Sequence, residues 1–347
     1  MKKKDTVFIT SSYRSGGALF TKMLNVNNEI KVSSGTINFF RYYFKKHKSK
    51  KIKFNYKSLL NQFCIRSKYR FGISLDYNAI IKEVEKKNFS YSDLYRLMCS
   101  KIFKNKKFNI TGEHAGNEWR NISNYFKIFP NGKVVILLRD PRDIICSFKK
   151  ITIAKKNDYL ISIFNFVDLI NYTYALKKNY DKKIHIVKFH ELKKNPSLVI
   201  KKVCKFLKIK YSHKMINENN YKGIDGKKWD QSKVFSFSGK LKKQNVDRWK
   251  SIIEMEDLFL CEFIANKQMK IIGLKRSNII FNKKTIRKGL NKITSSNLLT
   301  ESFMKWVINK EGNNKYPLDP TNPKNYDMSE FKSPKIFKIK YKQLTKQ

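Results

Sequence analysis

The sequence is poor in cysteine, and its few cysteines are badly placed for binding a metal or forming cross-links. Five are spread along the chain with no C-x-x-C pair among them: Cys64, Cys99, Cys146, Cys204 and Cys261. An odd number of widely spaced cysteines argues against both a zinc site and a disulfide framework. We therefore expect reduced thiols, no metal ion and a cytoplasmic location.

Long apolar runs are also missing. No stretch approaches the roughly 18 consecutive apolar residues that a membrane-spanning helix needs. The first residues, Met1–Asp5, lead directly into an apolar run that is too short for the hydrophobic part of a secretion signal. We therefore expect neither a membrane span nor a leader peptide.

Acidic residues are scarce relative to basic ones. The chain has 27 Asp and Glu against 75 Lys and Arg, a formal net charge of +48. One hypothesis is therefore a protein that binds nucleic acid or an anionic surface, with basic residues and aromatics gathered on one face. The alternative is coding bias, because the lysines are spread throughout and accompany abundant residues of A/T-rich codons. We expect weak attraction to polyanions or membrane surfaces and no specific nucleic-acid partner.

Short apolar runs alternate with helical patterns along most of the chain. The runs typical of strands lie at 7–9, 107–111, 133–138 and 183–189. This alternation predicts a doubly wound parallel sheet flanked by helices. Ligands of such sheets bind at the carboxyl ends of the strands, so we expect the loops at Arg14, Glu113 and Arg139 to face one crevice.

The helical patterns end with the segment 255–271. Beyond Gly273 the apolar pattern decays into a Lys-rich tail that contains three prolines, Pro317, Pro320 and Pro323. We interpret the chain as one α/β domain over residues 1–275 followed by an extension, 276–347, of unknown role.

The segment Val7–Leu24 contains the first candidate binding site. Its apolar run ends in a polar loop, Ser11–Gly17, and a helical pattern follows. The unpaired N–H groups and the dipole at a helix start attract anions, and the glycines let the backbone approach an oxyanion closely. Arg14 adds a guanidinium group. The G-x-x-x-x-G-K-[ST] pattern of P-loop kinases and triphosphatases is absent, so that class is disfavoured.

A second candidate site follows the apolar run at 133–138. Arg139 comes directly after this run, and Ser147 lies eight positions later in a predicted helix that begins near Pro141. A guanidinium fork matches phosphate oxygens, and a serine two turns into the helix can add a hydroxyl on the same side. The alternative for Arg139 is a salt bridge to Asp140 or Asp143.

These segments resemble the sulfotransferase family, whose members use 3′-phosphoadenosine 5′-phosphosulfate (PAPS) as the sulfuryl donor. The resemblance covers about residues 5–272 and includes two further segments, 186–206 and 247–250. It implies a P-loop-like fold, PAPS as co-substrate without a metal, and an acceptor hydroxyl or amine on a carbohydrate, glycolipid or small metabolite.

The resemblance also implies roles for individual residues. The implied donor-binding residues are Arg14, Ser15, Gly16, Gly17, Ala18, Leu19, Arg139 and Ser147. Lys242 and Lys243 lie where some members have a basic pair in a late loop. Glu113 is implied as the base that takes the acceptor proton. His114 stands where Lys is common and would stabilise charge or act as the base, and Arg14 would contact the transferred group.

Two departures from the family pattern leave open a sulfotransferase-like protein without activity. Gly17 and Ala18 replace paired hydroxyl residues, and each lost hydrogen bond to a charged group is worth roughly 1.5–3 kcal/mol. His114 replaces a fixed charge with a group that titrates near neutral pH.

Overall fold

The computed structural model describes residues 5–35, 37–42, 44, 56–86, 89–103, 108–149, 157–224, 226, 228–229 and 247–315. No helix in these ranges is long and apolar enough to cross a membrane.

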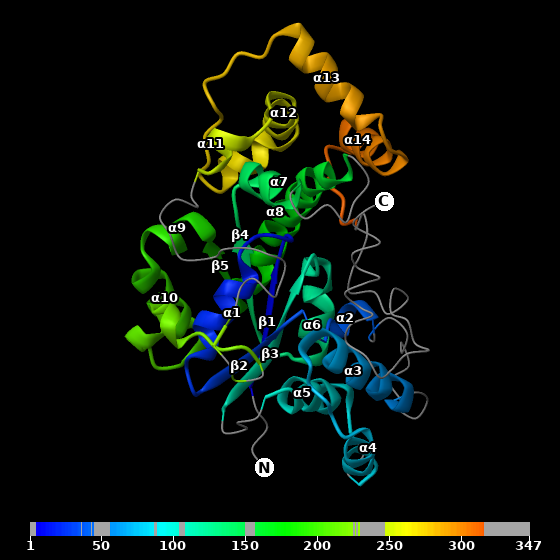
Figure 1. The fold of residues 1–347 in the computed structure, drawn as a ribbon, viewed down its shortest axis with the longest axis vertical. Helices are drawn as coiled ribbons and strands as arrows, with labels where there is room; N and C mark the ends of the chain where they lie inside the picture. Colours follow the sequence, from blue (N-terminus) through cyan, green and yellow to red (C-terminus); the bar gives the residue numbers. More distant parts are fainter. Residues whose placement is uncertain are drawn as a thin grey trace.

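A parallel sheet forms the centre of the described structure (Figure 1). Its five strands are β1 (Asp5–Ser11), β2 (Ile30–Ser34), β3 (Ile110–Gly116), β4 (Lys133–Leu138) and β5 (Ile184–Lys188). Their order is β2-β3-β1-β4-β5, and each neighbouring pair is parallel. The predicted doubly wound sheet is therefore confirmed. The chain moves from one side of β1 to the other between β3 and β4, which is where such sheets bind ligands.

Helices cover both faces of the sheet. On one face lie α1 (Gly17–Asn25), α9 (Phe189–Lys194) and α10 (Pro196–Leu207), packed on inward residues such as Val7, Ile9 and Val135. The other face carries a larger apolar core that includes Phe8 and Ile136. Its helices are α3 (Tyr56–Phe71), α5 (Tyr91–Lys101), α6 (Ile122–Ile128) and α8 (Ile161–Tyr180).

The helix starts follow the capping rules. The side chain of Asp76 accepts a hydrogen bond from Ala79 N at the start of α4 (Tyr77–Glu85). Ser90 and Asp93 form a reciprocal capping box at the start of α5. Three further helices complete the region around the carboxyl ends of the strands: α2 (Phe39–Tyr42), α7 (Pro141–Lys149) and α11 (Trp249–Ile252).

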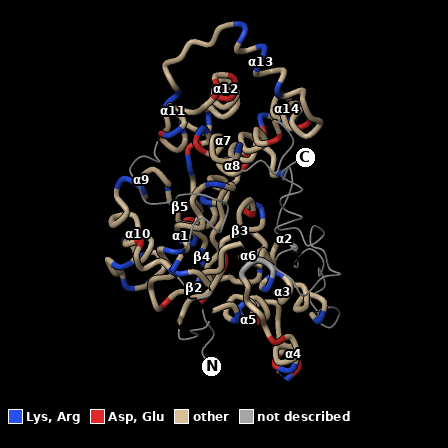
Figure 2. Tube along the Cα trace, in the orientation of Figure 1, with Lys and Arg blue, Asp and Glu red and all other residues tan. Residues whose placement is uncertain are grey.

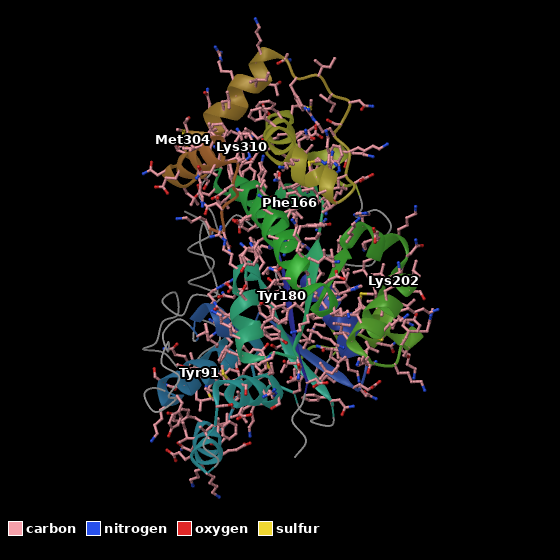
Figure 3. All side chains as sticks on the ribbon, turned by 180° about the vertical axis from the view of Figure 1, so that it is seen from behind. Tyr91, Phe166, Tyr180, Lys202, Met304 and Lys310 are labelled. Carbon is pink, nitrogen blue, oxygen red and sulfur yellow. The ribbon has the colours of Figure 1, made fainter. Side chains whose placement is uncertain are left out.

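The expectation that the pattern decays after Gly273 is wrong for residues up to 309. After α12 (Met255–Ile271) the chain forms α13 (Lys283–Ile293) and α14 (Asn297–Asn309). Both pack on the domain, with Ile293 and Leu299 buried in the larger core. Figure 3 shows α14, labelled at Met304 and Lys310, near the end of α8 opposite Tyr180. Apolar residues do recur at helical spacing in both helices, but lysines stand between them: Ile286, Leu290 and Ile293 in α13, and Leu299, Phe303 and Trp306 in α14.

Candidate active site

The loop between β1 and α1 turns sharply, as the sequence predicted for an anion site. Arg14 has φ 69° and Gly16 has φ 87°, so both adopt the left-handed backbone conformation. This conformation is strained for arginine and persists only where the surroundings enforce it. Ser15 N donates to Ser12 O at 3.3 Å and closes the turn that leads into α1.

The two glycines allow this loop to lie against its neighbours. A Cβ on Gly16 would lie 2.2 Å from Cε2 of Phe189, the first residue of α9. A Cβ on Gly17 would lie 2.0 Å from Nε2 of His114. Any side chain at either position would therefore displace an aromatic ring from the loop.

The structure brings the two predicted loops together. Arg14 Nε donates to Ser147 Oγ at 3.0 Å, and Arg139 Nη1 donates to the carbonyl oxygen of Arg14 at 2.8 Å. These contacts join residues more than 120 positions apart in the sequence. They form at the carboxyl ends of β1 and β4, where the topology changes direction.

Several polar atoms in this region are buried and have no hydrogen-bond partner among the residues that the structure describes. They are Ser12 Oγ, Ser15 Oγ and Arg139 Nε. Buried donors without partners are costly, and they cluster where a protein binds a ligand or ion. Ala18 is exposed and Leu19 packs beside the smaller core, so their side chains contribute no polar group to the cluster.

Two basic side chains, Arg139 and Lys193, lie near the ring of Phe189, a residue that the sequence analysis did not assign to the site. The guanidinium carbon of Arg139 lies 4.9 Å from the ring centroid of Phe189, and Lys193 Nζ lies 6.0 Å from it. Burial lowers the pKa of Lys193 to about 8, although Glu218 acts in the opposite direction. Burial likewise lowers the pKa of Arg139, against the influence of Asp143 at 3.7 Å. Both shifts indicate cations that gain from a bound anion.

Phe189 and Lys193 could have been found from the topology. The segment after β5 begins beside the end of β4, and residues at the carboxyl ends of neighbouring strands share a crevice. The sequence resemblance covered this segment but assigned no site residue there.

Glu113 and His114 point to opposite faces of the sheet, because they are consecutive residues of β3. Glu113 is buried and accepts a hydrogen bond from Phe39 N at the start of α2. It lies within the strand, three residues before the end of β3. Burial raises the pKa of this carboxyl group to about 8, so it is protonated at neutral pH.

His114 lies on the same face as α1. Its Nε2 is 3.2 Å from Ser11 Oγ, and its Nδ1 is 3.1 Å from Ser34 Oγ. Burial lowers the pKa of the imidazole to about 4, so the ring is neutral at pH 7. A neutral ring held by two hydroxyl groups beside the start of α1 can both donate and accept hydrogen bonds.

The segment 247–250 supports the second loop from behind. Arg142 forms salt bridges with Asp140 at 2.7 Å and Glu262 at 2.9 Å, and its guanidinium lies 3.9 Å from the ring centroid of Trp249. Asp143 accepts a hydrogen bond from Trp249 N at 3.1 Å. Arg142 and Asp143 therefore fix the start of α7. The remaining predicted site residues, Lys242 and Lys243, lie outside the described residues.

A family model described as the sulfotransferase family matches residues 6–213, more than half of the chain. The sulfotransferase domain from the curacin biosynthetic pathway is 16% identical, with a TM-score of 0.55, and the match covers 80% of this chain and all of that domain. The sulfotransferase domain from the Synechococcus PCC 7002 olefin synthase is 19% identical, with a TM-score of 0.52 and coverage of 76% and 97%. None of the curated proteins is similar enough in sequence to match. The chain belongs to the sulfotransferase family.

Proposed function

We propose that this protein transfers a sulfuryl group from PAPS to an acceptor hydroxyl or amine on a carbohydrate, glycolipid or small metabolite in the cytoplasm. The observation that carries the proposal is the contact between the two loops. Arg14, Arg139 and Ser147 meet through hydrogen bonds of 2.8 and 3.0 Å, although the sequence separates them widely. The family membership supports the reaction class, and this cluster supports the proposed position of the donor.

The residues present fit a donor that carries two phosphate-like groups. On one side, Ser15 Oγ is buried without a partner and two glycines leave the backbone open. On the other, Arg139 has a buried Nε without a partner, and Lys193 shares the Phe189 ring with it. We assign the residues on the first side to the 5′-phosphosulfate and the residues on the second side to the 3′-phosphate. Lys193 is an addition to the residues that the sequence suggested.

PAPS supplies an activated sulfur whose leaving group is a phosphate oxygen. The acceptor oxygen or nitrogen bonds to sulfur while the bond from sulfur to the bridging oxygen breaks, and the acceptor proton passes to a base. Arg14 and the N–H groups at the start of α1 stabilise the charge that develops on the leaving phosphate. Correct positioning of the two reactants supplies most of the remaining rate.

We assign the base to His114 in preference to Glu113. A general base must be unprotonated at the working pH and within reach of the donor loop. His114 is neutral and lies beside Gly17, whereas the pKa of Glu113, about 8, keeps that carboxyl group protonated and buried on the other face. The role of Glu113 in this proposal is to hold the start of α2 through Phe39 N.

The proposal is tested by titrating the protein with 3′-phosphoadenosine 5′-phosphate (PAP) in a calorimeter, with ATP and AMP as controls. About 0.3 M salt screens the non-specific attraction of a chain with a net charge of +48. We expect micromolar binding of PAP and much weaker binding of ATP. Arg139→Ala removes two charged hydrogen bonds, so PAP affinity should fall by about 100-fold or more.

Arg120→Ala is the matched control, because Arg120 pairs with Asp168 away from the two loops. This variant should bind PAP as the native chain does. Equal binding of PAP and ATP, or equal losses in the two variants, would reject the donor site and favour a protein that attracts polyanions through its charge.

A further inference from the structure

The segment between α12 and α13 presents two isoleucines to solvent. The side chain of Ile280 is 96% exposed, and that of Ile279 is 39% exposed. Figure 1 shows this segment at the end of the molecule opposite α4. A single exposed isoleucine is common on protein surfaces, whereas two in succession at a projecting point form a candidate contact site.

The isoleucines are held outward by contacts on both sides. Before them, Ser277 donates through its backbone N and its Oγ to the buried carboxylate of Glu262, at 2.7 and 2.9 Å. After them, the ring of Phe281 packs on Phe259, with 5.5 Å between the centroids. The segment is therefore fixed at both ends, with Ile280 almost fully exposed between them.

Basic residues flank the tip on both sides. Lys275 and Arg276 precede it, Lys283 and Lys284 follow it, and all four are exposed. Figure 2 shows Lys and Arg at both ends of this segment. The sequence has no acidic residue between Glu262 and Glu301. Lys275, Lys283 and Lys284 form no salt bridge with any residue in the part of the chain that the structure describes.

An apolar tip between basic pairs matches the boundary of an anionic membrane. Lysine and arginine bind the anionic headgroups, and aliphatic side chains enter the boundary between headgroups and acyl chains. A nucleic acid would satisfy the charges but would leave the isoleucines without a partner, because bases stack on aromatic side chains instead. We propose that residues 275–284 dock this protein on an anionic lipid surface, with Ile279 and Ile280 inserted.

Sedimentation with lipid vesicles tests this proposal with the full chain. Vesicles of phosphatidylcholine alone are compared with vesicles that contain about 30% phosphatidylglycerol, at roughly 0.15 M salt. We expect binding to the anionic vesicles only. The double variant I279S/I280S should weaken that binding by about tenfold or more. Ile308→Ser, at an isoleucine of α14 that is 71% exposed, is the matched control and should leave binding within twofold.

A second pair of variants separates a local site from the attraction of the whole charge. Lys283→Gln with Lys284→Gln should reduce binding by about tenfold, since each lysine near an anionic surface contributes measurably. Lys201→Gln with Lys202→Gln removes the same charge from exposed positions on α10 and should have little effect. Equal losses in both pairs would mean that the net charge alone attracts the vesicles, and would overturn the proposal.

Insertion itself is measured with Ile280→Trp, which keeps the tip apolar. The native chain has four tryptophans, so the signal of the introduced tryptophan is the difference between the fluorescence of the variant and that of the native chain. When anionic vesicles are added, this difference signal should shift to the blue and be quenched by brominated lipid. A tryptophan signal that is neither shifted nor quenched would overturn the proposal. The proposal would also be overturned if the native chain were a dimer that does not bind vesicles and I279S/I280S were a monomer, because a second copy of the chain would then cover the tip. PAP binding should be unchanged in every tip variant, so a failure here is distinct from a failure of the donor site.

Discussion

At the scale of single residues, two positions that depart from the family pattern, Gly17 and His114, are in direct contact. The resemblance implied a hydroxyl residue at position 17 and a lysine at position 114, where this chain has Gly17 and His114. Nε2 of His114 lies 2.0 Å from the position that a Cβ of residue 17 would occupy. The imidazole therefore fills the space that a side chain at 17 would need. His114 compensates in volume for the side chain that position 17 lacks.

The substitution Gly17→Ala tests this pairing. In a helix, alanine usually stabilises relative to glycine by roughly 0.5–1 kcal/mol. Here the clash with His114 should reverse the sign and lower the free energy of unfolding by about 1–3 kcal/mol. In the background His114→Ala the same substitution should be neutral or stabilising. Denaturant unfolding of the four proteins measures this coupling, and additive effects would contradict the pairing.

The three predicted site residues that the structure brings together share one property. Arg14, Arg139 and Ser147 lie in segments whose local pattern already suggests strand, loop and helix, so the topology brings them together. Phe189 and Lys193 were missed because their place depends on β5 lying beside β4. No local pattern states which strands are neighbours. Glu113 was placed in a loop, whereas the strand continues to Gly116 and turns its side chain into the core.

At the scale of elements, ion pairs join α13 to the rest of the domain. Lys292 lies 2.6 Å from both Glu254 and the buried carboxylate of Asp257. Lys288 on the same helix lies 3.8 Å from Glu256, and its side chain is 57% exposed. Lys292 therefore forms a mostly buried ion pair and Lys288 an exposed one, both between α13 and the start of α12. This difference in burial decides how much each ion pair contributes to the free energy of unfolding.

Replacing Lys292 with methionine should lower the free energy of unfolding by about 1–3 kcal/mol, because Asp257 loses a charged partner in a buried place. Asp257 keeps the hydroxyl of Tyr159 at 2.7 Å and the ammonium of Lys149 at 3.6 Å, which limits the loss. Lys288→Met should cost less than about 0.5 kcal/mol. Urea unfolding of the two variants gives the comparison. Equal costs would show that α13 does not depend on this contact.

At the scale of the whole molecule, the sequence predicted the sheet but not all that surrounds it. Alternating apolar runs specify a parallel sheet because both of its faces must be covered. The prediction failed beyond Gly273, where the apolar residues of α13 and α14 recur at helical spacing but are interspersed with lysines. Glu113, the implied base, and His114, the alternative base or charge-stabilising group, also differ in the folded state. Burial moves their pKa values in opposite directions.

These shifts determine how stability depends on pH. The pKa of Glu113 rises from 4.5 to about 8, so its contribution is full below pH 4.5 and is lost as pH rises towards 8. The pKa of His114 falls from 6.5 to about 4, so its contribution is present above pH 6.5 and is lost as pH falls towards 4. The two slopes oppose each other between about pH 4.5 and 6.5. Of these two groups, only Glu113 changes the stability between pH 6.5 and 8.

The variant Glu113→Gln isolates this effect, because glutamine can still accept the hydrogen bond from Phe39 N without ionising. The native chain should lose as much as about 1.4 kcal/mol of its free energy of unfolding per pH unit from pH 6.5 to 8, because its carboxyl group stays protonated only in the folded state. Glu113→Gln should not show this loss, so the difference between the two proteins should grow by that amount. The rate of sulfuryl transfer should stay within several-fold, since the native carboxyl group is protonated there as well. His114→Ala should instead reduce the rate by about 10²–10⁴-fold while PAP still binds. A loss of that size in Glu113→Gln, with the rate of His114→Ala preserved, would return the role of base to Glu113.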